Sequence, residues 1–185
     1  RLLPEMPAAE ANAVAEMLNR DLNAPACSSL GRIFDAAAAL LGLVRETDYE
    51  GEGPVLLEGL ASRAWSAGSR PEPEGLVPLG RGSPFRLDPV PLLARIALAR
   101  GTEAAPALAL RFHAEIAAAA FAGAEELRRL TGFATIALSG GVFQNVLLRD
   151  LLVPRLEAAG FDVRLNLGIP PGDGGLAVGQ AYRTA

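Results

Sequence analysis

The chain has 185 residues, half of them hydrophobic and 21% charged, a balance that supports a packed core and argues against disorder. Its net charge of −4 disfavours nucleic acid as the main partner, because binding to phosphates needs a clustered basic surface. All 17 basic residues are arginine, so lysine chemistry is excluded, from a Walker-type phosphate lysine to a Schiff base.

Cysteine and histidine each occur once in the chain, which limits the kinds of site that it can form. Cys27 cannot form an internal disulfide, which suits a reducing cytoplasm, and we interpret it as a small buried residue. His113 cannot build a histidine-rich metal site, and we expect it to be structural or exposed. No apolar run reaches the roughly 20 residues of a membrane span, so no membrane partner is expected.

The first elements are expected to be helices. Residues 8–20 form a short amphipathic pattern. A second, strongly apolar helix follows Ser28 or Ser29 as its N-cap and ends at Gly42. A third, with the sequence PVLLEGLASRAW, begins at Pro54, a residue favoured in the first turn of a helix.

The middle of the chain is rich in glycine and proline over residues 68–91. Because apolar helices flank this stretch, we interpret it as an excursion within a single lobe covering residues 1–185, not as a domain linker. Asp88 is expected to cap the helix containing LLARIALAR. A long helix is then predicted from about Glu103 to Leu130, with apolar residues repeating every four positions.

The last 55 residues change pattern. FATIALSGG predicts a buried strand, VFQNVLLRDLLVPRLEAAG a helix that ends at Gly160, FDVRLNL a second strand and LAVGQAYR a short final helix. Strand, helix and strand in this order imply a parallel pair joined by a crossover helix. The chain is therefore expected to belong to the α/β class.

The most specific pattern is the heptad SGGVFQN, from Ser139 to Asn145, at the carboxyl end of the first strand, where α/β sheets place their ligands. Gly140 and Gly141 would let the backbone approach a phosphate closely, and the helix that follows would offer free N–H groups to an anion. Asn145 is expected on the first turn, where its amide could bind a ribose hydroxyl or a base edge. The alternative is an ordinary tight turn.

A second pattern, PPGDGG, exposes the carboxylate of Asp173 at the mouth of the second strand. A carboxylate in this place could bind a hard metal ion that bridges phosphates. The alternative is that Asp173 caps the last helix, and spacing alone favours this alternative.

Three charged residues on the second and third helices are weaker candidates. Asp35 lies in an apolar helix, where a buried carboxylate needs a partner, either a ribose diol or Arg32 three residues earlier. Arg32 could instead contact phosphate or carbamoyl oxygens. Glu58 could face the nucleotide or lie on a solvated helix face.

The patterns SSLGRIFDAAAALLGL, YEG, SPFRLDPVPLL, LRFHAEIA, LSGGVFQN and PPGDGGLAVGQA resemble successive motifs of the HypF-type carbamoyltransferases. The likeness covers nearly the whole chain. The chain also resembles, less closely, the enzymes that make threonylcarbamoyladenosine on tRNA. Those enzymes usually have a lysine where this chain has Ala36. The resemblance implies the second lobe of an actin/Hsp70/sugar-kinase-like (ASKHA) fold with several long helices.

The resemblance also implies a reaction. ATP and carbamoyl phosphate give carbamoyl adenylate, and the carbamoyl group passes to the C-terminal cysteine thiol of a partner protein during maturation of nickel–iron hydrogenases. Alternatives are a small-molecule O-carbamoyltransferase lobe and a lobe that binds nucleotide or a protein without chemistry. A bacterial, cytoplasmic protein is expected.

Site roles follow from the same resemblance. Asp35 and Asn145 would hold the ribose and adenine, with Glu58 as a less certain contact. Gly140 and Gly141 would line the phosphates, and Ser139 is a weak phosphate or carbamoyl contact.

Asp173 would be the one ligand that this lobe supplies to a divalent metal ion. The paired metal-binding histidines of the family belong to an N-terminal lobe that this chain lacks. We therefore expect the fragment alone to be inactive and that missing lobe to be its partner.

Overall fold

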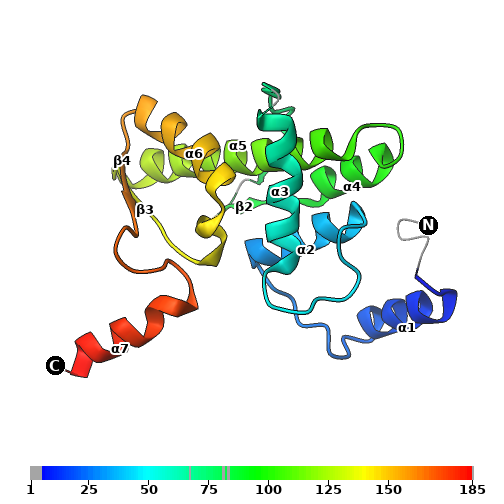
Figure 1. Ribbon diagram of the computed structural model, residues 1–185. Helices are drawn as coiled ribbons and strands as arrows, with labels where there is room; N and C mark the ends of the chain where they lie inside the picture. Colours follow the sequence, from blue (N-terminus) through cyan, green and yellow to red (C-terminus); the bar gives the residue numbers. More distant parts are fainter. Residues whose placement is uncertain (1–5, 67, 81, 83, 185) are drawn as a thin grey trace.

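The computed structural model describes residues 6–66, 68–80, 82 and 84–184. This part of the chain has seven α-helices, two short strand pairs and two single-turn 3-10 helices. Figure 1 shows how the helices and strands are arranged. In order they are α1 (Ala8–Asn19), α2 (Leu30–Leu40), α3 (Glu52–Ser66), β1 (Leu79–Gly80), β2 (Arg86–Leu87), α4 (Val90–Ala99), α5 (Ala105–Thr131), β3 (Thr135–Leu138), η1 (Gly141–Gln144), α6 (Val146–Ala158), β4 (Asp162–Leu165), η2 (Asp173–Gly175) and α7 (Leu176–Thr184).

Helix α5 is the centre of the core. α3 crosses it, α6 lies along it towards its C-terminal end, and α2 packs against α3 (Figure 1). Leu108, Phe112 and Ile116, the apolar residues four positions apart, are all buried. Phe34 of α2 meets Phe112 edge-on, with ring centroids 4.8 Å apart. The long helix expected over residues 103–130 is confirmed, and its apolar face organises the packing.

By length and composition alone, α5 could cross a membrane, contrary to the expectation from the sequence. Most of its apolar window is buried against the other helices, however, and the buried polar side chains of His113 and Glu115 lie on it. Packing inside the fold therefore accounts for its hydropathy.

The parallel strand pair is confirmed. Thr135 pairs with Asp162 and Leu138 with Leu165, and α6 is the crossover between β3 and β4. The expectation of a buried strand is wrong for β3. Ile136 and Leu138 pack on the core, while Thr135 and Ala137 alternate to the exposed face, because successive side chains of a strand point to opposite sides.

Most helix ends lie close to where the sequence places them. Gly42 and Gly160 follow α2 and α6 with left-handed φ values of 73° and 79°, as glycines after a helix commonly do. Asp88 accepts a hydrogen bond from the Val90 backbone N–H, the first of α4, at 3.0 Å, but Pro89 and not Asp88 holds the N-cap position. Ser29 holds the N-cap position of α2 without a side-chain bond, and α3 begins at Glu52, two residues before Pro54.

The glycine- and proline-rich excursion is fastened to α5. β1 and β2 form a short antiparallel pair in which Leu79 lies opposite Leu87. The buried carboxylate of Glu115 accepts hydrogen bonds from the backbone N–H groups of Glu74 and Leu76, the second at 2.9 Å. The excursion therefore packs on the same core as the flanking helices.

The two ends of the described chain are the least packed. α1 has no buried residue, every α7 residue whose burial is described is exposed, and both helices project from the body in Figure 1. The interpretation of Cys27 as buried is wrong, since it lies in an exposed segment between α1 and α2.

Candidate functional site

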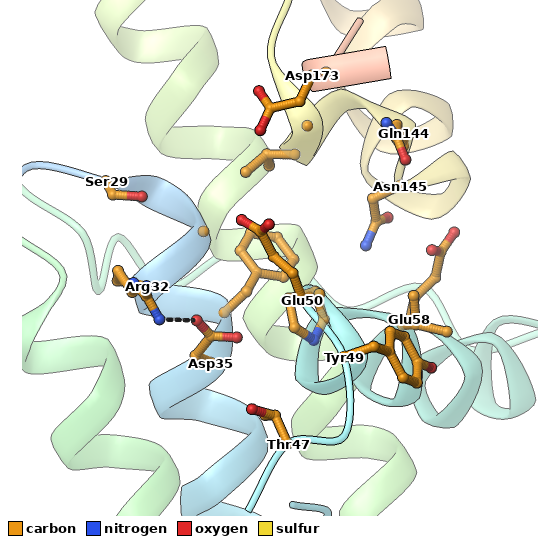
Figure 2. Close-up of a pocket in the computed structure, with 18 of the residues that line it drawn as sticks. Ser29, Arg32, Asp35, Thr47, Tyr49, Glu50, Glu58, Gln144, Asn145 and Asp173 are labelled. Carbon is orange, nitrogen blue, oxygen red and sulfur yellow. Dashed lines mark hydrogen bonds and ion pairs between the residues drawn. The ribbon is translucent and has the colours of Figure 1, made fainter. Parts of the chain in front are cut away.

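An open cleft of about 750 Å³ lies between α2, the loop that leads into α3, η1 and the loop that leads into η2. Figure 2 shows its polar side chains. The lining residues are Ser29, Gly31, Arg32, Phe34, Asp35, Thr47, Tyr49, Glu50, Gly51, Pro54, Val55, Glu58, Gly141, Val142, Gln144, Asn145, Gly172, Asp173 and Gly174. The cleft thus brings together six of the eight residues expected from the sequence. Ser139 and Gly140 lie beside it without lining it.

The two glycine-rich loops form one wall of the cleft. The Gly140 N–H donates to the Pro171 carbonyl at 2.8 Å, and Gly140 has a φ of 99°, which favours glycine. A Cβ at Gly172 would lie 2.9 Å from the Gln144 Nε2 and 3.3 Å from the Gly141 Cα. Only a residue without a side chain lets the loops approach this closely.

The start of α6 differs from the expectation. The chain makes the 3-10 turn η1 first, so Asn145 is the N-cap of α6 and not part of its first turn. Its Oδ1 accepts from the Leu148 N–H at 2.7 Å. One carboxylate oxygen of Glu58 accepts from Val146 N–H at 2.7 Å and Leu147 N–H at 3.1 Å.

The first three N–H groups of α6 are therefore taken by side chains of the cleft, and the expectation that they are free for an anion is wrong. The N–H groups of Gly141 and Val142, at the start of η1, have no hydrogen-bond partner among the described residues. These two groups are what the SGGVFQN segment can offer to an anion.

Below the cleft, His113 holds Asn145. Its Nδ1 lies 2.8 Å from the Ala109 carbonyl oxygen and its Nε2 lies 3.0 Å from the Asn145 Nδ2. Burial lowers the pKa of His113 to about 4, and the bond to Ala109 opposes this shift only in part. The ring is neutral at physiological pH, and the structural role expected for His113 is confirmed.

On α2, Arg32 and Asp35 form an ion pair, with Nη1 and Oδ2 3.3 Å apart (Figure 2). The pair expected as one alternative is thus present. The Arg32 side chain is 75% exposed, so the pair is weakly held and Arg32 can turn towards a ligand. Gly53 lies close to Asp35, because a Cβ on Gly53 would be 3.3 Å from the Asp35 Oδ1.

Asp173 is exposed and begins η2, where Gly172 holds the N-cap position. No described residue forms a hydrogen bond or ion pair with its carboxylate, so the capping alternative is not what the structure shows. In Figure 2 the carboxylate points towards the cleft. Within the described ranges, no three His, Cys, Asp or Glu side chains are grouped to hold a metal ion.

Several lining residues have no counterpart among the expected site residues. Thr47, Tyr49 and Glu50 come from the loop before α3, and Figure 2 shows the Glu50 side chain between Asp35 and Asn145 in that view. Gln144 presents its amide beside the loop of Asp173. The YEG motif was one of the patterns that resemble the family, but only the fold shows that this loop lines the cleft with the glycine loops.

Residues 2–180 match a protein family described as the second subdomain of the Kae1-like domain of carbamoyltransferases. The chain belongs to this family. Its fold is the ASKHA-type lobe expected from the resemblance, and the HypF-type likeness is confirmed.

Among curated relatives, carbamoyltransferase HypF2 of Cupriavidus necator is 39% identical over 91% of this chain. A HypF homologue of the same organism is 38% identical over 95%, and HypF of Rhodobacter capsulatus 37% over 97%. The chain spans 23%, 45% and 22% of the lengths of these three proteins. This family member thus corresponds to one part of much longer relatives.

Two solved structures share the fold. A full-length HypF in a phosphate- and nucleotide-bound form aligns over 99% of this chain with a TM-score of 0.88 and 28% identity. HypF of T. kodakarensis aligns over 97% with a TM-score of 0.74 and 29% identity. The chain covers 24% and 23% of those two proteins.

Proposed function

We propose that the cleft is the second-lobe half of a nucleotide site in a HypF-type carbamoyltransferase. In this proposal ATP and carbamoyl phosphate form carbamoyl adenylate, and the carbamoyl group passes to the C-terminal cysteine thiol of a partner protein in nickel–iron hydrogenase maturation. Family membership supports the class of enzyme. The geometry of this chain supports the nucleotide site, as follows.

The observation that carries the proposal is the meeting of the two glycine-rich loops. The bond from Gly140 N–H to the Pro171 carbonyl joins them, and it brings Asp173 and the start of η1 to one wall of the cleft. Asp35 lies on the α2 side of the cleft, and Glu58 bonds to the start of α6, next to η1. Backbone N–H groups can bind phosphates, and carboxylates can accept hydrogen bonds from ribose hydroxyls or bind a metal ion.

The phosphates are assigned to the N–H groups of Gly141 and Val142. These donors lie at the start of η1, at the carboxyl end of β3, where parallel strands direct their ligands. Arg32, across the cleft and mostly exposed, supplies the nearest positive charge of the lining. We propose that it leaves Asp35 in part and turns to a phosphate or carbamoyl oxygen when ligand binds.

The nucleoside is assigned to Asp35, Glu58 and Asn145. The carboxylates of Asp35 and Glu58 line the cleft and can accept hydrogen bonds from ribose hydroxyls. Asn145 lies between them and the glycine loops, and its amide retains one N–H and one lone pair beyond its bonds within the protein.

The charge of the cleft favours binding of a metal ion together with the phosphates. Four carboxylates, those of Asp35, Glu50, Glu58 and Asp173, line it with the single guanidinium of Arg32. A nucleoside phosphate would be repelled by this set unless a divalent cation accompanied it. Asp173 and Glu50 have no described partner, and we propose Asp173, the residue that the resemblance indicates, as the one ligand from this chain, the others coming from another lobe of the longer protein.

We propose a cytoplasmic location, since Cys27 is free and exposed and suits a reducing compartment.

The test is a titration of the full-length protein that carries this chain with a non-hydrolysable ATP analogue and Mg²⁺, followed by NMR. Saturable shifts are expected at the amides of Asp35, Gly140, Gly141 and Asp173. The amides of Gly101 and Gly132, in turns that do not line the cleft, serve as controls and should not move. A protein that shows no shift at the cleft with millimolar analogue would contradict the proposal.

A second arm addresses the acceptor. The same protein is assayed with carbamoyl phosphate, ATP and a peptide ending in cysteine, beside the same peptide ending in serine. Carbamoylation of the cysteine peptide alone is expected. Transfer to the serine peptide would instead favour an O-carbamoyltransferase.

A further inference from the structure

We propose that His113 is a positioning residue that fixes the orientation of the Asn145 amide in the cleft and thereby sets the affinity for nucleotide. The inference rests on the proposed nucleotide site. His113 does not line the cleft and touches no ligand position itself.

The hydrogen bonds of His113 permit one arrangement. The Ala109 carbonyl oxygen can only accept, so the hydrogen of the neutral ring must lie on Nδ1. Nε2 then carries a lone pair and must accept a hydrogen bond. The Asn145 atom that faces it at 3.0 Å is therefore the amide nitrogen, Nδ2.

The hydrogen bond at the oxygen end of the Asn145 amide independently indicates the same orientation. The Leu148 backbone N–H can only donate, so the Asn145 atom 2.7 Å from it must be the oxygen, Oδ1. Two fixed partners on different helices thus select the same one of the two amide orientations. Asn145 is only 7% exposed, which leaves little room for any other side-chain conformation.

The surroundings of His113 keep its ring in place and uncharged. The side chain is fully buried, and the rings of Phe34 and Phe112 meet it edge-on with centroids 5.4 and 5.7 Å away. A buried position against two aromatic rings disfavours the imidazolium, whose second N–H would face the N–H of Asn145.

The effect on the cleft depends on the hydrogen-bonding groups of the Asn145 amide that its bonds within the protein do not use. After its two internal bonds, Asn145 offers a ligand one N–H from Nδ2 and one lone pair on Oδ1. Loss of the His113 acceptor leaves the amide held by the Leu148 N–H alone, so its Nδ2 end is no longer fixed. The ligand must then order this amide on binding, which lowers the affinity.

A double-mutant cycle in the full-length protein tests whether His113 acts through Asn145. The affinity for a non-hydrolysable ATP analogue with Mg²⁺ is measured for the wild type, His113→Leu, Asn145→Ala and the double variant. His113→Leu should bind roughly tenfold more weakly. The double variant should bind no more weakly than Asn145→Ala alone, because both changes remove the same interaction.

Three outcomes would overturn the inference. Unchanged affinity of His113→Leu would show that the ring does not matter, and additive losses would show that it acts independently of Asn145. A wild-type protein that binds no analogue would overturn the proposed function, and with it the ligand role of His113. That outcome differs from the first two, in which the wild type binds.

A buried control on the same helix separates positioning from general destabilisation. Glu115→Gln disturbs a buried polar group that holds the excursion and does not line the cleft, so its affinity should equal that of the wild type. His113→Gln should restore most of the affinity, since Oε1 can accept from Asn145 and Nε2 can donate to Ala109. An equal loss in Glu115→Gln, or no rescue in His113→Gln, would contradict a positioning role.

A spectroscopic measurement needs no variant. The ¹⁵N shifts of the His113 ring at pH 7 should show a neutral ring with the hydrogen on Nδ1. An imidazolium, or the tautomer with hydrogen on Nε2, would be incompatible with the proposed orientation of Asn145.

Discussion

Two polar side chains that face the cleft, Glu58 and Asn145, also hold the first turn of α6. Each uses oxygen atoms to satisfy backbone N–H groups that a helix leaves without partners at its start. A ligand that forms hydrogen bonds with these side chains therefore either replaces the bonds that cap the helix or is bound together with them. If the proposed function holds, we expect ligand binding at the cleft to be coupled to the geometry of α6.

Asp173 differs, because its carboxylate has no described partner to lose. In the full-length protein, Asp173→Asn should lower the rate of carbamoyl transfer by about 100-fold, since it removes the charge that would bind the metal ion. The melting temperature should not change. The measurement is a transfer assay at saturating ATP and Mg²⁺ beside thermal unfolding. Full activity in this variant would remove Asp173 from the site.

His113 makes the stability of the fold depend on pH. Its pKa is about 4 in the folded chain and near 6.5 when unfolded, so below pH 6.5 the unfolded chain takes up a proton that the folded chain does not. Its contribution to stability is thus lost as the pH falls from about 6.5 to about 4, and amounts to about 3 kcal/mol.

Urea unfolding at pH 7 and pH 4.5 measures this effect. His113→Gln has no titrating group at this position, so its stability should fall less over the same range. Equal pH dependence in the two proteins would contradict the assignment of a neutral, buried His113.

At the scale of elements, the contact between the loops before η1 and η2 decides the shape of the cleft. Gly172→Ala would push a methyl group against Gln144 and the Gly141 backbone, and so part the loops. Nucleotide affinity should fall roughly tenfold. Gly168→Ala is the matched control in the same loop, because a Cβ there meets no atom within 4 Å. Isothermal titration calorimetry compares them, and equal affinities in both variants would argue against close packing of the loops.

The excursion between α3 and α4 depends on one buried carboxylate. Glu115→Gln replaces one accepting oxygen with a donor that faces a backbone N–H of Glu74 or Leu76, and should destabilise the fold by about 2 kcal/mol. Trypsin should then cleave after Arg86 faster than in the wild type. Glu125→Gln, on the exposed face of the same helix, should change neither property. Unchanged cleavage in Glu115→Gln would mean that other contacts hold the excursion.

At the scale of the whole molecule, the described chain leaves several large apolar side chains exposed. Leu167, Tyr182 and Phe133 are 92%, 86% and 75% exposed, and α1 buries none of its residues. A two-stranded parallel sheet with one face uncovered is also unusual, because parallel sheets are normally covered on both faces. The relatives are two to more than four times longer than this chain, which gives them further residues to cover these surfaces.

The isolated 185-residue chain should therefore self-associate or bind a hydrophobic dye such as ANS, whereas the full-length protein should bind little. Size-exclusion chromatography with light scattering and ANS fluorescence measure this. Leu167→Ser with Tyr182→Ser should reduce both signals without unfolding the chain. A monomeric, dye-free wild-type chain would show that these side chains need no cover.

The sequence by itself determined the elements and the family. The apolar period of four predicted α5, strand–helix–strand order predicted the parallel pair, and the glycine-containing heptad and PPGDGG located both loops of the cleft. These features are local, because helix period, turn glycines and caps act over a few residues. The roles of the site residues in binding stay predictions.

Only the tertiary structure decided how the polar groups are used. Glu58 bonds to the start of α6, and Asp173 is left without a described partner. His113 lies beneath the cleft and bonds to Asn145, although nothing in the local sequence distinguishes it from a surface residue. The loop with Tyr49 and Glu50 faces the glycine loops only because α2 and α3 pack together. Hydrogen bonds between residues 30 to 90 positions apart form when distant helices pack, and no local pattern records which of them will meet.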